Sequence, residues 1–392
     1  MGKAWAVMWA AFLASVAVVI NQFKVPPVMH ILLEELSIDL ALGGWLMSIF
    51  SVAGIILSLP AALTLDRFGA RLSGMVALIC TVLGSLIGTF ATNATMLLAG
   101  RAVEGIGLGL IAVVAPAVIA MWFPPEKRGL PMGIWAAWVP VGSFIILNLA
   151  SPINGSFGWQ GVWWFGSGFA LIALILYSLI VSEPPLAGEE KSGTERISGD
   201  LYRKGLKSPA IWLLAVGFGG FGFANAAFVT WGPSFLMERH GFAEELANFY
   251  VSLSPMVAIG ATVIAGWVID KSGKPKTILL VSSIMACLLY GYAFLLNSVA
   301  LVVPWMIMLG LFPGFFPTSS FTLAPEAVPT PMLAGLAMAL INLMFNLGFM
   351  MGPPLVGALV NQAQGNWSAG ALPVVAALLI TITTSGLFAK KT

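Results

Sequence analysis

The heptapeptide LDRFGAR at residues 65–71 has a counterpart in IDKSGKPK at residues 269–276. In both stretches an Asp is followed at once by a basic residue, and a Gly stands three residues after the Asp. These residues are Asp66, Arg67 and Gly69 in the first stretch and Asp270, Lys271 and Gly273 in the second. The same separation relates Asn21 to Asn225. A separation that stays constant at several positions predicts a chain of two homologous halves.

The sequence around these two stretches is strongly apolar. Hydrophobic residues make up 59% of the chain and charged residues 9%, which is typical of a protein with several membrane spans. The apolar runs continue for about 20 residues or more without the alternation of a β-barrel strand, so we predict helices. The twelve predicted spans are residues 5–33, 42–65, 72–89, 96–123, 130–150, 162–181, 209–237, 245–269, 277–296, 300–321, 332–360 and 369–389.

One sizeable hydrophilic stretch separates the sixth and seventh predicted spans, SEPPLAGEEKSGTERISGDLYRKGLKS at residues 182–208. Its content of Glu, Gly, Ser and Lys is typical of a solvated linker rather than a folded domain. The predicted fold class is therefore an all-α membrane protein with twelve transmembrane helices in two pseudo-symmetric six-helix bundles. The bundles are expected at residues 1–182 and 209–392, with a cytoplasmic linker at residues 183–208.

The basic residues between the spans predict the orientation in the membrane. With both termini and the linker in the cytoplasm, nearly all loop lysines and arginines fall on the cytoplasmic side, as the positive-inside rule requires. Only Arg239 falls in an outer loop. The chain has no nucleotide-binding motif of the GxxxxGK[ST] kind, which favours a prokaryotic inner (plasma) membrane protein that is driven by gradients rather than by ATP.

Three motifs resemble those of one known family, the major facilitator superfamily. ALTLDRFGAR at residues 62–71 resembles its loop signature G-x-L-x-D-R-x-G-R-R, and GWVIDKSGKPK at residues 266–276 resembles the second-half counterpart. RAVEGIGLG at residues 101–109 is similar to the fourth-helix signature R-x-x-x-G-x-G, and WFPPEKRG at residues 122–129 to the cytoplasmic turn that follows it. The resemblance extends over essentially the whole chain. It implies the fold of this superfamily and secondary transport by alternating access.

The resemblance also implies that the two Asp-containing turns act as gates, which latch the halves together on the cytoplasmic side. The gating residues would be Asp66, Arg67, Gly69, Arg71, Asp270, Lys271 and Gly273. The alternative is a plain tight turn, in which Gly permits a backbone conformation that a side chain would strain. Ala62 and Ala70 depart from the signature, which has Gly and a basic residue at these positions, so the first gate is expected to make fewer contacts.

The fourth predicted span contains Arg101 and Glu104, which are three residues apart and share one helix face. Charges in a membrane span are expensive unless they face the protein interior or find a partner. We therefore expect an ion pair between these two residues. Either the pair only stabilises helix packing, or Glu104 exchanges a proton and Arg101 tunes the pKa of Glu104. Gly105 and Gly109 are expected to let this helix approach a neighbour closely.

The first predicted span contains Lys24, within INQFKVPPVMH at residues 20–30. Either this lysine snorkels to the outer interface, or it faces a central cavity as a lone cation beside Asn21, which lies on the same helix face. Pro26 and Pro27 are expected to bend the helix there. The residue at the corresponding position of the second half is Phe228, so only the first half contributes the charge. An unpaired cation in a cavity most readily meets an anion.

These features predict a secondary transporter for a small anionic solute such as a monocarboxylate, coupled to protons through Glu104 or working by anion exchange. Lys24 would supply the charge contact, and the resemblance places the first and seventh helices around the cavity. Further substrate-binding residues are expected among Asn21, Gln22, Asn225, Asn342, Asn346, Trp138 and Trp231. The alternative is an exporter of neutral or lipophilic compounds of the multidrug antiporter type, which the aromatic and methionine-rich spans would suit.

Other functional classes are not favoured by the sequence. An enzyme would need a nucleophile, an acid/base pair or metal ligands, whereas His30 and His240 are isolated and Cys80 and Cys287 lie in separate spans. We expect no enzymatic activity, no cofactor and no metal site. No basic cluster with interleaved aromatic residues suggests a nucleic acid partner. The expected partners are a small, anionic substrate, the lipid bilayer and protons, and the chain is expected to be monomeric.

Overall fold

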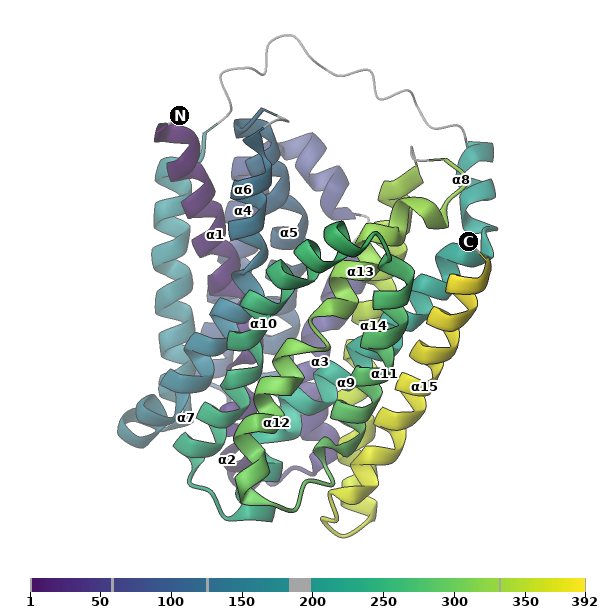
Figure 1. Cartoon of the computed structure of the whole chain (residues 1–392). Helices are drawn as coiled ribbons and strands as arrows, with labels where there is room; N and C mark the ends of the chain where they lie inside the picture. Colours follow the sequence, from purple (N-terminus) through teal and green to yellow (C-terminus); the bar gives the residue numbers. More distant parts are fainter. Residues whose placement is uncertain (1, 58–59, 125–126, 183–198, 331–332, 392) are drawn as a thin grey trace. The chain divides into compact units, whose positions relative to one another are not determined.

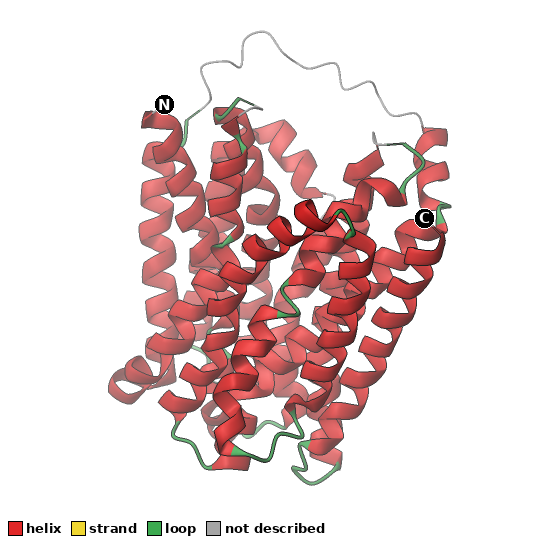
Figure 2. Ribbon diagram, viewed as in Figure 1, coloured by secondary structure: helices red, strands yellow, loops and turns green. Residues whose placement is uncertain are grey.

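The computed structural model describes residues 2–57, 60–124, 127–182, 199–330 and 333–391. Throughout these residues the chain forms helices joined by turns and loops, with no strand (Figure 2). The predicted all-α class is therefore confirmed. The chain divides into two compact units. Unit 1 comprises Met1–Ile38 and Trp45–Glu190, and unit 2 comprises Asp39–Gly44 and Lys191–Thr392.

Unit 1 is built around four long helices that pack side by side. Helix α1 packs against α5 and α7, and α4 packs against the same two helices (Figure 1). Its elements are α1 (Gly2–Phe23), η1 (Pro26–Val28), α2 (Met29–Glu35), most of α3 (Leu40–Leu57), α4 (Pro60–Thr89), α5 (Ala94–Trp122), α6 (Gly129–Ala136) and α7 (Trp138–Ile180).

Unit 2 is centred on helix α9, which packs against α14 and α15 (Figure 1). Helix α11 packs against α15, and α10 against α12. Its elements are α8 (Gly199–Leu206), α9 (Pro209–His240), α10 (Glu244–Ser272), α11 (Pro275–Ala293), α12 (Val299–Leu311), α13 (Phe315–Leu323), η3 (Ala324–Ala327), α14 (Ala334–Gln362) and α15 (Ser368–Lys391).

The described residues contain 11 helical runs that are long and apolar enough to cross a membrane, rather than twelve separate helices. The difference comes from the run Gly129–Ile180, which includes the fifth and sixth predicted spans. Within it Gly158 has φ 68° and ψ 176°, which is not helical, so the chain turns there without a loop. Dividing this one run at Gly158 gives the twelve spans of the predicted fold.

The predicted close approach of the fourth span to a neighbour is confirmed at Gly105. A Cβ on Gly105 would lie 2.5 Å from the backbone oxygen of Phe50, so only glycine lets α5 pack this closely on α3. In unit 2, a Cβ on Gly352 would lie 2.4 Å from the backbone oxygen of Phe223, where α14 packs on α9. Both helices therefore meet their neighbours backbone to backbone.

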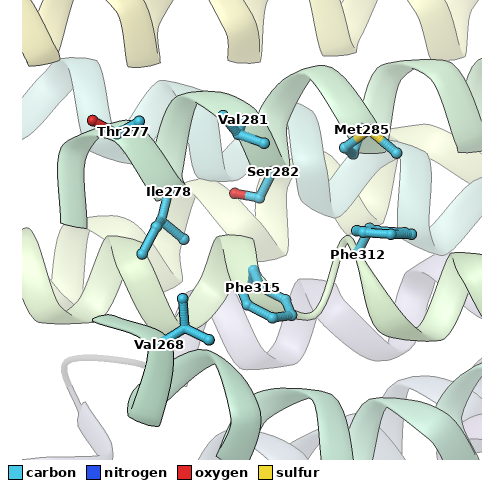
Figure 3. Close-up of a pocket in the computed structure, with 8 residues that line it drawn as sticks. All are labelled: Val268, Thr277, Ile278, Val281, Ser282, Met285, Phe312 and Phe315. Atoms are coloured by element: carbon cyan, nitrogen blue, oxygen red, sulfur yellow. The ribbon is translucent and has the colours of Figure 1, made fainter. Parts of the chain in front are cut away.

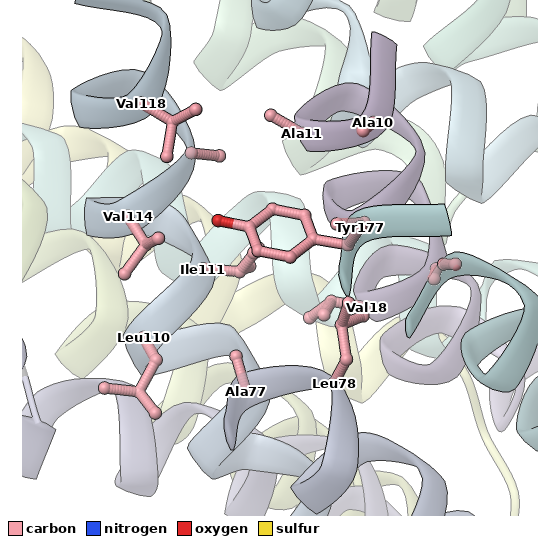
Figure 4. Close-up of a cluster of buried hydrophobic side chains, with 14 of the residues drawn as sticks. Ala10, Ala11, Val18, Ala77, Leu78, Leu110, Ile111, Val114, Val118 and Tyr177 are labelled. Atoms are coloured by element: carbon pink, nitrogen blue, oxygen red, sulfur yellow. The ribbon is translucent and has the colours of Figure 1, made fainter. Parts of the chain in front are cut away.

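The core of unit 1 surrounds the ring of Tyr177 from α7. Apolar side chains such as Val18, Leu78 and Ile111 reach this cluster from α1, α4 and α5 (Figure 4). The hydroxyl group of Tyr177 donates a hydrogen bond to the backbone oxygen of Ala70, at 3.0 Å. The core therefore holds the turn that contains the first gate sequence.

The linker prediction is tested only in part. Residues 183–198 lie outside the described residues, whereas Gly199–Leu206 forms the short helix α8. This helix carries Arg203 and Lys204 in its last turn, where positive charge stabilises the negative end of the helix dipole. The C-terminal part of the predicted linker is therefore helical, and the cytoplasmic location of the linker stays a prediction.

Candidate functional site

The first membrane span, Gly2–Glu35, is broken beyond its middle, at Lys24. Helix α1 ends at Phe23, and the chain continues through the short helix η1, which begins at Pro26. In an α-helix the carbonyl oxygen of Gln22 would accept a hydrogen bond from the amide of residue 26, but proline has no amide hydrogen. The sequence PPV therefore leaves backbone acceptors of α1 without their helical donors, inside a buried part of unit 1.

Arg101 of α5 supplies a donor in place of the amide hydrogen that Pro26 lacks. Its Nη2 donates to the carbonyl oxygen of Gln22 at 2.8 Å, and its Nη1 donates to that of Asn21. Its Nε donates to the carbonyl oxygen of Leu46 at 2.9 Å. Positive charge is favourable at the C-terminal end of a helix, where the carbonyl groups point outward. Arg101 therefore closes the end of α1 that the prolines leave open.

Lys24 is fully buried and its ammonium group has a partner for each hydrogen. The Nζ atom lies 2.8 Å from Asn21 Oδ1, 2.7 Å from Ser85 Oγ and 2.6 Å from Glu104 Oε1. It also lies 4.7 Å from the ring centre of Trp163. An ammonium group has three hydrogens, so all are used. The prediction of a lone cation is therefore wrong, because Glu104 neutralises it, and the snorkelling alternative is wrong as well.

Glu104 joins the two cations. One carboxylate oxygen pairs with Lys24 and the other with Nη1 of Arg101, each at 2.6 Å, and all three side chains have no exposed surface. The predicted pair between Arg101 and Glu104 is confirmed. Two cations against one carboxylate leave a net single positive charge when all three groups are ionised. In surroundings of low dielectric constant such a charge interacts strongly with any further anion or proton.

Two members of this cluster were not identified from the sequence. Ser85 accepts a hydrogen bond from Lys24 and donates one to the backbone oxygen of Trp163 at 2.8 Å, which fixes its orientation. The indole ring of Trp163 lies against the ammonium group, in a favourable cation–π arrangement. A serine within an apolar span is a signal that could have been noticed, whereas nothing distinguishes Trp163 from the other tryptophans of the chain.

Asn21 positions Lys24 as expected for two residues on one helix face. Its Oδ1 accepts from Lys24, while its Nδ2 donates to the backbone oxygens of Ala17 at 2.9 Å and Gly166 at 3.1 Å. A Cβ on Gly166 would lie 2.4 Å from Asn21 Oδ1. The side chain of Gln22 is nearly buried, and its contribution to the site is the backbone oxygen that Arg101 binds.

The predicted site residues of unit 2 do not form a comparable charge cluster. Asn225 donates to the hydroxyl oxygen of Tyr290 at 2.9 Å, a partner that the sequence did not indicate. Asn346 donates to the backbone oxygen of Asn342 at 2.9 Å, which confirms that these two side chains lie one turn apart. Trp231 is fully buried, and its indole nitrogen donates to the backbone oxygen of Pro353. Trp231 therefore makes a packing contact between α9 and α14, and its expected role in substrate binding stays a prediction.

The aromatic residues of the fifth predicted span form a stacked pair in unit 1. The rings of Trp135 and Trp138 lie 5.6 Å apart with an angle of 13° between their planes. Both side chains are partly exposed, and Trp135 Nε1 donates to Ser15 Oγ at 3.0 Å. The expected role of Trp138 in substrate contact stays a prediction.

The two gate sequences form the tight turns that their glycines predict. Gly69 has φ 76° and Gly273 has φ 61°, both in the left-handed region that favours glycine. In the first turn Arg71 Nη2 donates to the backbone oxygen of Ser178 at 2.7 Å, which ties the turn to the end of α7. The side chain of Asp66 lies outside the described residues.

The basic residues of both turns pack against neighbouring aromatic or acidic groups. The Arg67 guanidinium lies 5.4 Å from the ring centre of Phe68. In unit 2, Lys276 at the start of α11 lies 3.6 Å from the carboxylate of Glu326. Asp270 is exposed at the end of α10. A latch between the two halves stays a prediction.

Comparisons with known proteins identify the family. The sequence profile described as Major Facilitator Superfamily matches residues 11–334. The hexuronate transporter of Bacillus subtilis (strain 168) is 24% identical over 370 residues, which cover 88% of this chain and 86% of that protein. The D-galactonate transporter of Escherichia coli O6:H1 is 23% identical over 376 residues, with the same coverage of 88% and 86%.

A solved structure shows the same fold. It is a bacterial homologue of the human lysosomal transporter Spinster, in an inward-facing and unoccupied conformation, with a TM-score of 0.81 and 19% sequence identity. The similarity covers 99% of this chain and 96% of that one. Together with the profile match over most of the sequence, these findings establish that the chain belongs to the major facilitator superfamily of membrane transporters.

Proposed function

We propose that the protein transports a small organic anion of the sugar-acid type by alternating access, and that it takes up a proton with each anion. The observation that carries this proposal is the buried pair between Lys24 and Glu104 at 2.6 Å. Both relatives named above are transporters of sugar acids, whose carboxylate group would suit a buried cation. Both termini are proposed to lie in the cytoplasm, as the loop charges indicate.

The proposed coupling follows from the charge balance of the cluster. A buried cation without a partner is costly, so Lys24 should always have one anion beside it. While Glu104 is ionised, its carboxylate fills that place. Protonation of Glu104 removes the negative charge, and the carboxylate of a substrate then becomes the favoured partner of Lys24. Binding of the proton and binding of the anion therefore assist one another.

The groups that face Glu104 support this reading. Lys24 follows the last residue of α1, whereas Arg101 lies on α5 itself and also donates to three backbone oxygens. Lys24, in contrast, has only two neutral acceptors besides Glu104, namely Asn21 and Ser85. Protonation of Glu104 would leave both cations without an anion, and Lys24 would keep fewer acceptors than Arg101.

Transport assays with purified protein in liposomes test the proposal. The panel contains labelled galactonate, a labelled hexuronate, the uncharged sugar galactose and a lipophilic cationic dye. We expect uptake of at least one sugar acid, faster when the outside is more acidic than the inside, and no uptake of galactose. Transport of the dye alone would instead support the alternative, an exporter of lipophilic compounds, for which the stacked rings of Trp135 and Trp138 would provide an aromatic surface.

A further inference from the structure

A groove of about 240 Å³ lies on unit 2, where the tenth predicted span is interrupted. Helix α12 ends at Leu311 and α13 begins at Phe315, with Pro313 and Gly314 between them. The interruption leaves space between these helices and α11 (Figure 3). The walls come from three parts of the unit and include Val268, Ile278, Val281, Met285, Phe312 and Phe315.

The groove is lined mainly by apolar side chains and has almost no free hydrogen-bonding group. Ser282 also lines it, but its hydroxyl group donates to the backbone oxygen of Leu279 at 3.0 Å. The volume is below the roughly 300–1,000 Å³ of pockets that enclose a drug-sized ligand, and the groove is open, since Val281 is 53% exposed. A linear hydrocarbon chain fits this shape better than a compact polar solute.

The surface around the groove is the kind that a membrane-spanning helix presents to lipid. Val263 and Ile264 on α10 and Ile284 and Leu288 on α11 are large, apolar and exposed. Both helices are apolar enough to cross a membrane. The groove therefore opens toward the region that acyl chains occupy in a bilayer.

One end of the groove carries an excess of positive charge. Lys271 lies in the last turn of α10, Lys274 immediately before α11 and Lys276 in its first turn. Thr277, the next residue, lines the groove. The first amide groups of a helix also attract anions. Two carboxylates oppose these three lysines, those of Asp270 and Glu326, and Glu326 pairs with Lys276 at 3.6 Å. The net charge of these five side chains is therefore positive.

An aromatic residue marks the same end as the membrane–water boundary. Trp267 is 61% exposed, and the Nζ atom of Lys271 lies 4.8 Å from its ring centre. Exposed tryptophans are enriched at the level of lipid head groups, and lysines beside them attract anionic head groups. The apolar groove therefore lies where the acyl chain of a phospholipid would be, and the lysines lie where its head group would be.

We propose that unit 2 binds one anionic glycerophospholipid, with an acyl chain in the groove. Its phosphate-bearing head group would lie on Lys271, Lys274 and Lys276, where α10 ends and α11 begins. The lipid would fill the space between α11 and the break between α12 and α13. This proposal is independent of the transported solute, because the groove lies outside the cluster around Lys24.

Native mass spectrometry of the full chain, released from detergent, tests the proposal. The protein is titrated with phosphatidylglycerol or phosphatidylcholine that carry the same acyl chains. We expect phosphatidylglycerol to be retained more strongly. Replacing the three lysines together by Gln should remove this preference, with binding of phosphatidylglycerol weakened by roughly tenfold or more, since each lysine near an anionic head group adds attraction. Equal retention of the two lipids by the unchanged protein would overturn the proposal.

Two tryptophan substitutions on α11 test the place of the acyl chain. Val281→Trp fills the groove, whereas Ile284→Trp adds the same bulk at an exposed position that does not line it. Only V281W should weaken retention of phosphatidylglycerol, by roughly tenfold for the apolar contact that is lost. Equal effects of the two substitutions would contradict the assignment.

A crosslinking experiment uses the unchanged protein, so its outcome does not depend on whether a substituted protein folds. Phosphatidylglycerol with a photoreactive group on its acyl chain should label peptides that contain Met285 or Phe312, which lie in the groove. Labelling that is spread evenly over the exposed apolar surface would show that the groove holds no particular lipid, and would overturn the proposal.

Discussion

Replacing Arg101 by Lys should destabilise the protein although it keeps the positive charge. The guanidinium group bonds four acceptors, namely three backbone oxygens and one oxygen of Glu104. A lysine has three hydrogens at the end of a flexible stem, so at least one buried acceptor loses its donor. Loss of a hydrogen bond to a charged group costs ~1.5–3 kcal/mol. We therefore expect the apparent Tm of R101K to fall by on the order of 5 °C.

Thermal unfolding followed by tryptophan fluorescence in detergent measures this change. The matched control is Arg239→Lys, because Arg239 is exposed and bonds a single side-chain oxygen, that of Asn297, which a lysine can also reach. R239K should unfold within about 1 °C of the unchanged protein, since exposed substitutions cost ~0.5 kcal/mol or less. An R101K protein as stable as R239K would refute the assigned role of Arg101.

A double-mutant cycle separates the role of Arg101 at the helix break from its pairing with Glu104. Pro26→Ala restores the amide that can bond the carbonyl oxygen of Gln22, which then depends less on Arg101. We expect R101K to cost ~1 kcal/mol less in the P26A background, because interacting residues are not additive. The same cost in both backgrounds would mean that the prolines and Arg101 are unrelated.

Two further predictions concern glycines, each with a control glycine whose added Cβ would meet nothing within 4 Å. Gly166→Ala should lower stability by ~1–3 kcal/mol, because the new Cβ would lie 2.4 Å from Oδ1 of Asn21. Gly168→Ala should have little effect on stability. Thermal unfolding measures both variants. Gly69→Ala should lower stability by ~1–2 kcal/mol, because Gly69 has φ 76°. Gly266→Ala should leave stability unchanged. Equal Tm values for G69A and G266A would contradict the assigned turn.

The sequence was sufficient for the fold because the features that determine it are local. Apolar runs long enough to cross a bilayer predict helices, and Gly69 and Gly273 predict the turns in which both have positive φ. The long run Gly129–Ile180 was not foreseen as one element. The stretch between its two spans, SPINGSFGWQG at residues 151–161, contains polar residues, but the chain stays helical there except at the turn at Gly158.

The site was predictable only where the contacting residues are close together in the sequence. Arg101 and Glu104 are three residues apart, so helix geometry alone brings them together. Lys24 and Glu104 are 80 residues apart, and their contact depends on how α5 is rotated toward α1. No sequence periodicity fixes that rotation in a helix that is apolar nearly all round. For this reason Lys24 was expected to be unpaired, whereas each hydrogen of its ammonium group has an acceptor.

The bonding of Arg101 to the backbone of α1 could have been anticipated in part. Pro26 and Pro27 predict freed carbonyl groups, which need donors inside a membrane protein. The sequence does not say which donor takes them, because the arginine comes from another helix. The carbonyl acceptors and the guanidinium group together explain why a permanent cation is tolerated in the fourth span.

The central claim is that a substrate carboxylate and Glu104 compete for Lys24. Transport into liposomes is measured for the sugar acid that the panel identifies, in two modes: uptake driven by a proton gradient, and exchange of labelled for unlabelled anion at equal pH on both sides. Three proteins are compared, the unchanged chain, Glu104→Gln and Lys24→Gln, each checked for thermal unfolding above the assay temperature.

The E104Q protein resembles the protonated state, so it should exchange the anion but no longer be accelerated by the gradient. The K24Q protein should lose both modes by roughly tenfold or more, as expected for loss of a charge-assisted hydrogen bond of ~1.5–3 kcal/mol. If K24Q transports the anion as fast as the unchanged protein, Lys24 is not the charge contact. If E104Q still responds fully to the proton gradient, Glu104 is not the group that couples the proton to the anion.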